Sequence, residues 1–215
     1  AQIRGAGTDT IKIKGVPSLH GSTYTIIPDQ IEAGTFMIAA AATRGDVTIT
    51  NVIPRHLEII GSKLIEAGVK VDYMTDSVRV WVDEGAKLRS INFIALPYPG
   101  FPTDEQAPFM ALMSIASGNT LFIETIFENR FKHVGELLRM GAKITTEGRV
   151  SLVEGVKKLH SATVQATDLR GGAGLAVAAL AAEGSTVISS VEHIYRGYEN
   201  FEYNISELGG KIKKI

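Results

Sequence analysis

Cysteine is absent from this chain of 215 residues. Its absence excludes disulfides, thiolate metal sites and a cysteine nucleophile within the sequence. A surplus of charge is lacking too, because 22 Lys and Arg residues stand against 23 Asp and Glu residues. Such a balanced surface does not favour nucleic acid as a partner. The five histidines show no spacing typical of metal ligands, so we expect no metal site and place them at surface or helix-cap positions.

Long apolar runs are also missing. No segment reaches the roughly 18 to 20 apolar residues of a membrane span, and no basic and then apolar leader opens the sequence. We therefore expect a soluble, cytoplasmic protein that does not bind membranes. The hydrophobic content of 45% supplies a core, and the length allows one large domain or two small ones.

The sequence is organised as an internal repeat of about 70 residues. Gly15, Gly85 and Gly155 recur at equal intervals of 70 residues in similar settings. Each copy reads as a strand, a helix, a second strand, a second helix and a closing hairpin. The copies cover residues 15–84, 85–154 and 155–215. This pattern predicts a single α/β domain over residues 1–215 with pseudo-threefold symmetry, rather than three domains.

The first helix of each copy is apolar on every side. The three sequences are GTFMIAAAAT, APFMALMSIAS and GLAVAALAAE, and each is followed by a glycine suited to ending a helix. Helices of this composition must be buried on every side, so we expect them at the centre with the sheets outside. The strands that precede these helices are expected within residues 22–27, 90–95 and 162–166.

The third copy lacks its closing hairpin, because the chain ends after GKIKKI. Residues 10–14, TIKIK, precede Gly15 as the closing strands of the other copies precede Gly85 and Gly155. We expect residues 10–14 to pair with residues 211–214 and complete the third repeat, unless a segment absent from this sequence supplies that strand.

One aspartate stands at the start of the first helix of every copy: Asp29, Asp104 and Asp168. The ordinary interpretation is a helix N-cap. Asp29 fits it best, because Glu32 resembles the second half of a capping box. Near Asp104, Thr103 can cap the helix instead, which leaves the carboxylate available as a general base. For Asp104 both roles stay open.

Arginines occupy corresponding ends of the repeats. A single arginine is usually a solvated charge, but Arg130, Arg170 and Arg196 are expected at one face together with two of the aspartates. Three converging guanidinium groups favour a phosphate or carboxylate ligand. The glycines at 171–174 lack the lysine and hydroxyl residue of a phosphate-binding loop, so close helix packing is the favoured account of them.

Four motifs in order carry a resemblance to a known family. They are FPTD at 101–104, TIFENRF at 125–131, ATDLR at 166–170 and HIYRGYE at 193–199. From about Ile3 to Ile215 the chain resembles the UDP-N-acetylglucosamine enolpyruvyl transferase (MurA) family of 1-carboxyvinyltransferases. The resemblance implies the inside-out α/β barrel, or prism, that this family shares with 5-enolpyruvylshikimate-3-phosphate (EPSP) synthase.

The resemblance also implies an activity. Members of the family move the enolpyruvyl group from phosphoenolpyruvate to the 3-hydroxyl of UDP-N-acetylglucosamine and release phosphate. This is the first committed step of peptidoglycan precursor synthesis, so the implied role lies in cell wall biogenesis, cell shape and the cell cycle with its division. No cofactor is implied.

The motif matches carry site residues with them. The implied catalytic residues are Asp104, Asp168, Arg170 and Arg196. The implied substrate-binding residues are Thr103, Asp104, Ile126, Phe127, Arg130 and Arg196. In this scheme Asp104 takes or orients the hydroxyl proton, and Arg196 holds phosphoenolpyruvate.

Complete family members have two such domains with the active site between them. Their loop cysteine, amino-terminal lysine and asparagine have no counterpart here, so the chain resembles the carboxyl-terminal domain alone. We expect it to need the missing amino-terminal domain for activity and to self-associate through apolar surface that this domain would cover. The alternatives are an EPSP synthase-like enzyme and a stand-alone, non-catalytic binding or scaffold domain.

Overall fold

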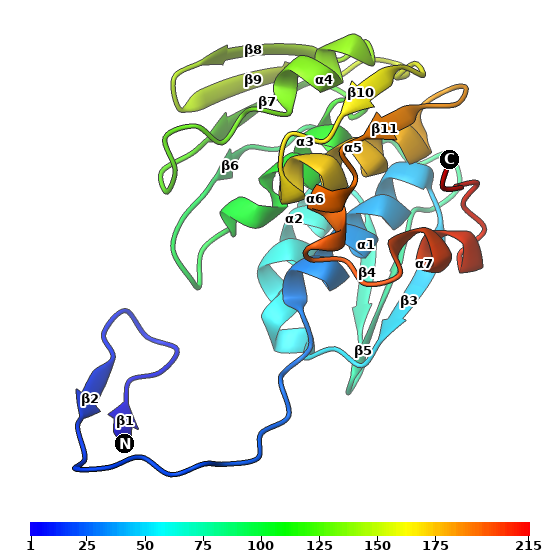
Figure 1. Cartoon of the computed structure of the whole chain (residues 1–215). Coiled ribbons are helices and arrows are strands. Elements are labelled where there is room, and N and C mark those ends of the chain that lie inside the picture. The colour runs from blue at the N-terminus through cyan, green and yellow to red at the C-terminus, as the bar shows by residue number, and fades with distance from the viewer.

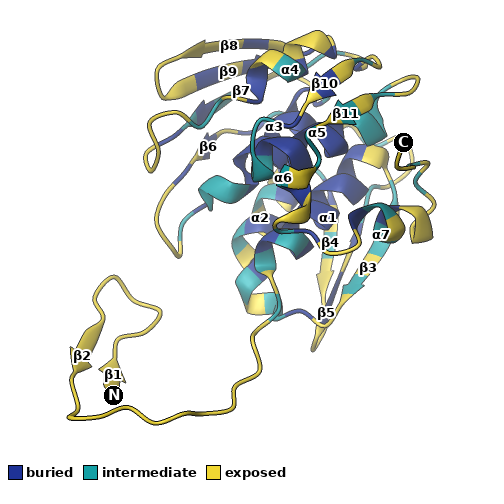
Figure 2. Cartoon of the chain, in the orientation of Figure 1, coloured by how far each residue is buried: buried dark blue, intermediate teal, exposed yellow.

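Three buried helices form the centre of the computed structural model, which describes residues 1–215 (Figure 1). They are α1 (Gln30–Thr43), α3 (Gln106–Met113) and α5 (Leu169–Ala181). The three helices pack against one another, and every residue of α3 is buried. Figure 2 shows these helices as mostly buried, whereas the outer strands contain both buried and exposed residues. The prediction of central helices is confirmed, because an all-apolar helix has no face to give to water.

The first sheet has the order β3 (Asp46–Thr50), β5 (Ser77–Trp81) and β4 (Lys70–Tyr73), with both pairs antiparallel. Val78 and Val80 of β5 are fully buried, whereas Arg79 between them is exposed. The short helices η1 (Pro54–Leu57) and α2 (Glu58–Glu66) connect β3 to this hairpin. Alternating burial along β5 thus turns one face of the sheet toward the core.

The second sheet has four strands in the order β6-β7-β9-β8. They are β6 (Phe93–Ile94), β7 (Asn119–Ile123), β9 (Val150–Glu154) and β8 (Lys143–Glu147). Only β6 and β7 run parallel, and the other pairs are antiparallel. Helix α4 (Val134–Arg139) leads from the loop after β7 to β8 and contacts α5. The loop between β7 and α4 is thereby fixed at both ends.

The third sheet contains only the parallel pair β10 (Thr163–Gln165) and β11 (Val187–Ser189). After β11 the chain forms α6 (Glu192–Tyr195) and α7 (Phe201–Glu207). Tyr198, between these two helices, is buried in a small apolar cluster with Phe36 and Phe201. This cluster attaches the end of the chain to α1.

Pairing of residues 10–14 with residues 211–214 is not found, so that expectation is wrong. Instead β2 (Lys12–Lys14) pairs antiparallel with β1 (Gln2–Arg4), while residues 211–215 form no strand. The turn between β1 and β2 contains Gly5 and Gly7, both at positive φ, which lets the chain reverse locally. Pairing between β1 and β2, which are close in sequence, costs less loop-closure entropy than pairing between segments about 200 residues apart.

The strand expected within residues 22–27 is also absent. Residues 1–27 are exposed throughout and extend away from the three helices (Figure 1). In the other copies β6 and β10 form beside β7 and β11 and gain a partner for their backbone groups. No such partner lies beside residues 22–27, so their β-branched composition alone does not produce a strand.

None of the helices combines the length and the apolar character needed to cross a membrane.

Candidate active site

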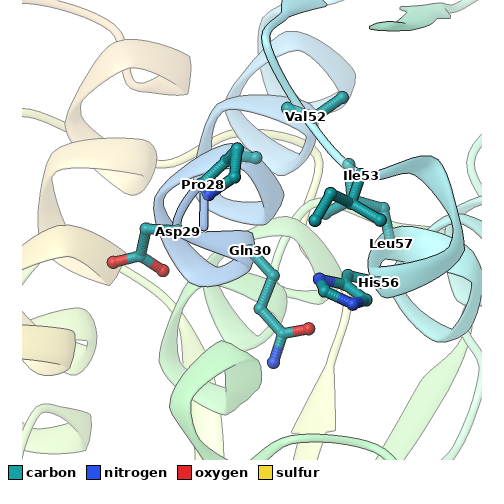
Figure 3. Close-up of a pocket in the computed structure, with 8 residues that line it drawn as sticks. Pro28, Asp29, Gln30, Val52, Ile53, His56 and Leu57 are labelled. Atoms are coloured by element: carbon teal, nitrogen blue, oxygen red, sulfur yellow. The ribbon is translucent and has the colours of Figure 1, made fainter. Parts of the chain in front are cut away.

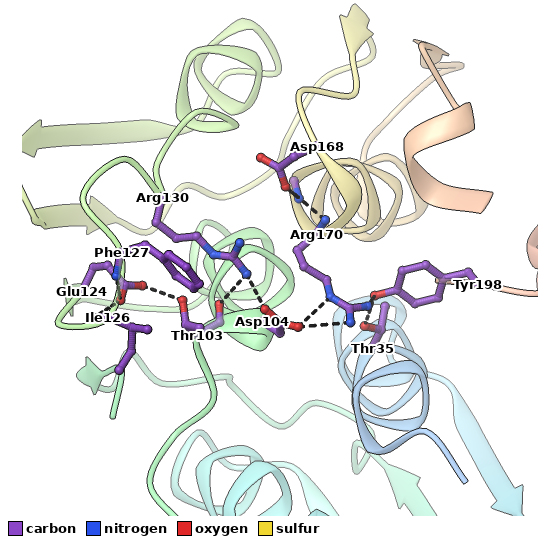
Figure 4. A network of polar contacts seen from close by, with 11 residues as sticks. Thr35, Thr103, Asp104, Glu124, Ile126, Phe127, Arg130, Asp168, Arg170 and Tyr198 are labelled. Atoms are coloured by element: carbon purple, nitrogen blue, oxygen red, sulfur yellow. Dashed lines mark hydrogen bonds and ion pairs between the residues drawn. The ribbon is translucent and has the colours of Figure 1, made fainter. Parts of the chain in front are cut away.

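Asp104 lies between two arginines at the start of α3 (Figure 4). Its Oδ1 accepts a hydrogen bond from Nη2 of Arg130 at 2.6 Å, and its Oδ2 accepts one from Nε of Arg170 at 3.1 Å. Arg130 comes from the loop after β7, and Arg170 from the first turn of α5. Two repeats of the chain therefore meet at one carboxylate.

The local backbone explains why this carboxylate is free for the arginines. Asp104 lies inside the 3₁₀ helix η2 (Thr103–Glu105), and neither η2 nor α3 has a side-chain cap. The capping interpretation therefore does not hold for Asp104. Thr103 does not cap the helix either, because its hydroxyl donates to Oε2 of Glu124 at 2.6 Å.

Asp168 is a helix cap. Its Oδ1 accepts hydrogen bonds from the backbone N–H of Arg170 at 3.1 Å and of Gly171 at 2.8 Å. Asp29 caps α1 in the same way, through the N–H groups of Ile31 and Glu32. Asp168 makes no contact with Asp104, but its cap fixes the helix turn from which Arg170 extends.

Arg170 is the more buried of the two arginines. Its side chain is 12% exposed, against 20% for Arg130. Burial acts to lower the pKa of Arg170, but the neighbouring Tyr198 and Asp104 outweigh it and raise that pKa above its ordinary value. Nη1 of Arg170 also donates to the hydroxyl of Tyr198 at 3.3 Å. Arg170 is thus a fixed cation.

Tyr198 links this cation to α1. Its hydroxyl lies 2.8 Å from Oγ1 of Thr35, and burial raises its pKa to about 12. The phenol is therefore neutral at physiological pH and can bridge Arg170 and Thr35 by hydrogen bonds (Figure 4). Sequence reasoning did not single out Tyr198, because an aromatic residue next to a helix is usually part of the core.

Ile126 and Phe127 lie beside Arg130 on the loop after β7 (Figure 4). Their backbone N–H groups donate to Oε1 of Glu124 at 2.6 and 3.0 Å, and the same carboxylate holds Thr103. Glu124 is 2% exposed and was not predicted, although it orders three of the predicted binding residues. The side chains of Ile126 and Phe127 remain 38% and 49% exposed, so they are available to a ligand.

Arg196 does not join the other two arginines. It is exposed at the C-terminal end of α6, and its side chain makes no hydrogen bond or ion pair. The following residue, Gly197, packs against Leu169, and a Cβ there would lie 3.5 Å from Nη1 of Arg170. The backbone next to Arg196 thus lies close to Arg170, although the side chain of Arg196 makes no contact with the other two arginines. The expected convergence is found for two guanidinium groups, and the role of Arg196 stays a prediction.

His133 occupies the N-cap position of α4, which is one of the two kinds of place expected for the histidines, but it is buried. It is 1% exposed, its Nε2 has no hydrogen-bond partner, and burial lowers its pKa to about 4. The helix α4 begins after it and packs against α5, where His133 lies against Gly171. The apolar neighbours Phe131 and Val134 were the only sequence signal for this burial.

The glycines at the start of α5 serve packing, as favoured from the sequence. A Cβ at Gly174 would lie 2.7 Å from the carbonyl carbon of Ala107 in α3, and one at Gly172 would lie 2.7 Å from the side chain of Ile194. Both contacts are too short for any larger residue. Gly174 thus brings α5 close to α3, which carries Arg170 toward Asp104, and Gly172 brings α5 close to α6.

A separate hollow of about 160 Å³, including open solvent, lies where α1 begins (Figure 3). Its lining includes Asp29, Gln30 and His56 but no residue bonded to Asp104. No group of three or more His, Asp or Glu side chains is arranged to ligate a metal ion. The charged, partly exposed groups around Asp104 suit an anion, and they are the stronger candidate site.

Comparison with known proteins identifies the family and the fold. Residues 1–205 match the family model of EPSP synthase (3-phosphoshikimate 1-carboxyvinyltransferase). The structure is similar to the enolpyruvyl transferase NikO from Streptomyces tendae, with a TM-score of 0.80 and 31% identity over 88% of this chain and 45% of that one. An EPSP synthase from Acinetobacter baumannii shares the fold, with a TM-score of 0.71 and 18% identity over 99% of this chain and 53% of that one. The predicted EPSP synthase-like α/β fold is confirmed.

Relatives named UDP-N-acetylglucosamine 1-carboxyvinyltransferase are more similar in sequence. One from Desulfofundulus thermocisternus is 57% identical over 213 residues, which is 99% of this chain and 87% of the relative. One from Clostridium botulinum is 54% identical over 215 residues, or 100% of this chain and 51% of the relative. The chain thus spans about half the length of the clostridial protein. The chain belongs to the EPSP synthase family and, within it, to the UDP-N-acetylglucosamine 1-carboxyvinyltransferases.

Proposed function

We propose that this chain supplies one half of the active site of an enzyme that transfers the enolpyruvyl group of phosphoenolpyruvate to the 3-hydroxyl of UDP-N-acetylglucosamine. Phosphate is the second product, and the step begins peptidoglycan precursor synthesis in the cytoplasm. The observation that carries the proposal is the carboxylate of Asp104 held between Arg130 and Arg170. The names of the relatives point to the same reaction.

The charges around Asp104 fit this chemistry. Two guanidinium groups face one carboxylate, so the group of three carries one positive charge in excess. Such a site attracts a phosphate or carboxylate without losing the basic oxygens of Asp104. Asp104 then accepts the hydroxyl proton of the sugar as general base, and the arginines stabilise the anionic substrate and the developing charge.

The other proposed residues have supporting positions. Ile126 and Phe127 offer apolar surface next to Arg130 for the nucleotide sugar. Asp168 holds the turn of α5 that positions Arg170 and is the second group proposed for proton transfer. Arg196 has its guanidinium free and is proposed to reach phosphoenolpyruvate when the substrates are bound.

The site is open to one side, and we propose that an amino-terminal domain closes it. Residues 1–27 are exposed and include seven apolar residues that are each more than half exposed. They are Ile3, Ile11, Ile13, Leu19, Tyr24, Ile26 and Ile27. Apolar surface of this extent favours burial against a partner. Without that domain the chain is expected to be inactive and to self-associate, which light scattering over a range of concentrations checks.

Phosphate release tests the proposal. The full-length protein, incubated with phosphoenolpyruvate and UDP-N-acetylglucosamine, should release phosphate, and the 215-residue chain should not. Shikimate 3-phosphate, offered as the alternative acceptor, should give no release. Release with shikimate 3-phosphate alone would reassign the substrate, and the absence of release with either acceptor would leave a non-catalytic binding domain.

A further inference from the structure

Glu105, the residue after Asp104, is a carboxyl group buried without a partner. Its side chain is 0% exposed, and neither Oε1 nor Oε2 has a hydrogen bond. Buried polar side chains nearly always find a partner, and an isolated ionised carboxylate in such a place is very unfavourable. The proposed reaction makes no use of Glu105, so its position needs another explanation.

The space that Glu105 occupies is formed by a glycine. Gly34 of α1 faces Glu105, and a Cβ at residue 34 would overlap with Oε1 of the glutamate. The same Cβ would lie 2.6 Å from the side chain of Ile60, which closes the other side. Only glycine leaves room for the carboxyl group here, so the crossing of α1 and η2 accommodates it specifically.

This space adjoins the network around Asp104. Thr35, next to Gly34 on α1, bonds to Tyr198, and Tyr198 accepts from Arg170. Glu105 therefore lies against the residue next to Thr35, and it is fully buried, whereas the side chain of Asp104 is partly exposed.

The charged and titratable groups that face Glu105 come from three elements and one segment. They are Arg170 of α5, Asp104 of η2, Asp29 at the start of α1, and Tyr198 between α6 and α7. Burial raises the pKa of Glu105 well above its usual value, Arg170 opposes this effect, and the two aspartates add to it. Tyr198 is neutral, with a pKa of about 12. A neutral carboxylic acid is thus the form that this environment favours.

We propose that Glu105 is a positioning residue for anion binding, which as a neutral acid leaves Arg130 and Arg170 with one positive charge that Asp104 does not balance. If Glu105 loses its proton, its negative charge cancels that surplus, and the site loses affinity for anions. This inference rests on the proposed function only in assigning the two arginines to an anionic substrate. It adds that a residue out of reach of the substrate determines the charge of the site.

Sulfate binding tests the proposal, because sulfate stays a dianion over the whole range and arginine stays protonated. We would titrate the 215-residue chain with sodium sulfate between pH 6 and 10, at constant ionic strength, and follow the side-chain N–H signals of Arg130 and Arg170 by NMR. In the unmodified chain, the dissociation constant for sulfate should rise about tenfold as Glu105 ionises. In Glu105→Gln, which cannot ionise, it should stay constant over the same range.

The matched control is Glu128→Gln. Glu128 lies on the loop of Arg130, and its side chain is 91% exposed, so water surrounds its carboxyl group. This variant should show the same alkaline loss of affinity as the unmodified chain. If Glu105→Gln also loses affinity for sulfate as the pH rises, the proposal is overturned.

Two further results would also decide the matter. If sulfate shifts neither arginine signal at any pH, the proposed anion site fails, and the role of Glu105 fails with it. If sulfate binds but the ¹³C carboxyl signal of Glu105 titrates near pH 4 to 5, Glu105 is not neutral and only the present inference fails. The carboxyl measurement uses the unmodified chain, so it remains decisive even where Glu105→Gln does not fold.

Discussion

The first and second repeats place an aspartate at the same junction and use it differently. Asp29 accepts two backbone N–H groups of α1, whereas Asp104 accepts hydrogen bonds from two arginines. The 3₁₀ turn η2 includes Asp104 in its helix, so this side chain points away from the backbone donors. The comparison teaches that the position within a repeat fixes where a carboxylate lies, while the facing repeats decide what it binds.

The largest effect is expected when the charge of one of these two aspartates is removed. Asp104→Asn should lower phosphate release by the full-length protein about 100-fold or more, because the general base and the negative charge between the two arginines are lost. Asp29→Asn should leave the rate nearly unchanged, since asparagine caps a helix as well as aspartate. Equal losses in the two variants would show that Asp104 has no special role.

A second prediction concerns the third junction, where Asp168 lies near the buried His133. The pKa of His133 is about 4 in the folded chain against an ordinary value of 6.5. Because the pKa is lowered on folding, neutral His133 makes its full contribution to the free energy of unfolding above pH 6.5. This contribution is lost as the pH falls toward 4, by roughly 3 kcal/mol in total. Urea unfolding at several pH values should show this loss, and His133→Asn should remove it.

Glu105 changes stability with pH in the direction opposite to His133, so the two contributions must be measured separately. Its pKa is raised in the folded chain, so its contribution to stability is present at low pH and declines as pH rises above its unfolded pKa. The loss due to His133 is therefore read as the difference between the unmodified chain and His133→Asn at each pH. The partly buried His193 gives the control, and His193→Asn should follow the unmodified chain.

A smaller effect sharpens the assignment of Asp29 as a cap. Asp29→Ala should lower the free energy of unfolding by about 1 kcal/mol, whereas Asp29→Asn should change it little. Urea unfolding of both variants measures the difference. Equal destabilisation by alanine and asparagine would mean that the charge of Asp29, and not its hydrogen bonds, stabilises α1.

The smallest expected effect on stability belongs to Arg196. Because its side chain is exposed and unbonded, Arg196→Ala should change the free energy of unfolding by less than about 0.5 kcal/mol. The same variant of the full-length protein should raise the KM for phosphoenolpyruvate if Arg196 holds that substrate. An unchanged KM would remove Arg196 from the proposed site.

Much of the architecture was predictable because it depends on local composition. The helices APFMALM and GLAVAALA are apolar on all sides, so burial at the centre was the only stable outcome. The closing hairpins expected in the first two copies are also found, as β4-β5 and β8-β9. Residues 22–27 have a similar β-branched composition but form no strand, because a strand needs a neighbour that the sequence does not specify.

The candidate site was predictable in its residues and less so in its connections. The motifs identified Asp104, Arg130 and Arg170, and the structure joins them directly. The supporting groups Glu124 and Glu105 were missed, because an acidic residue in a loop or first helical turn is usually solvated. Their burial follows from the packing of segments far apart in the sequence, and no local pattern reports it.

The sequence by itself determined the three central helices, the hairpins and the family, since these depend on composition, period and motif. Only the tertiary structure decided which aspartate caps a helix, which one binds arginine, and which carboxyl group is buried without a partner. The physical reason is that charge and protonation depend on what surrounds a group. Around Asp104 and Glu105, the surroundings come from α1, the loop after β7 and α5, which lie far apart along the chain.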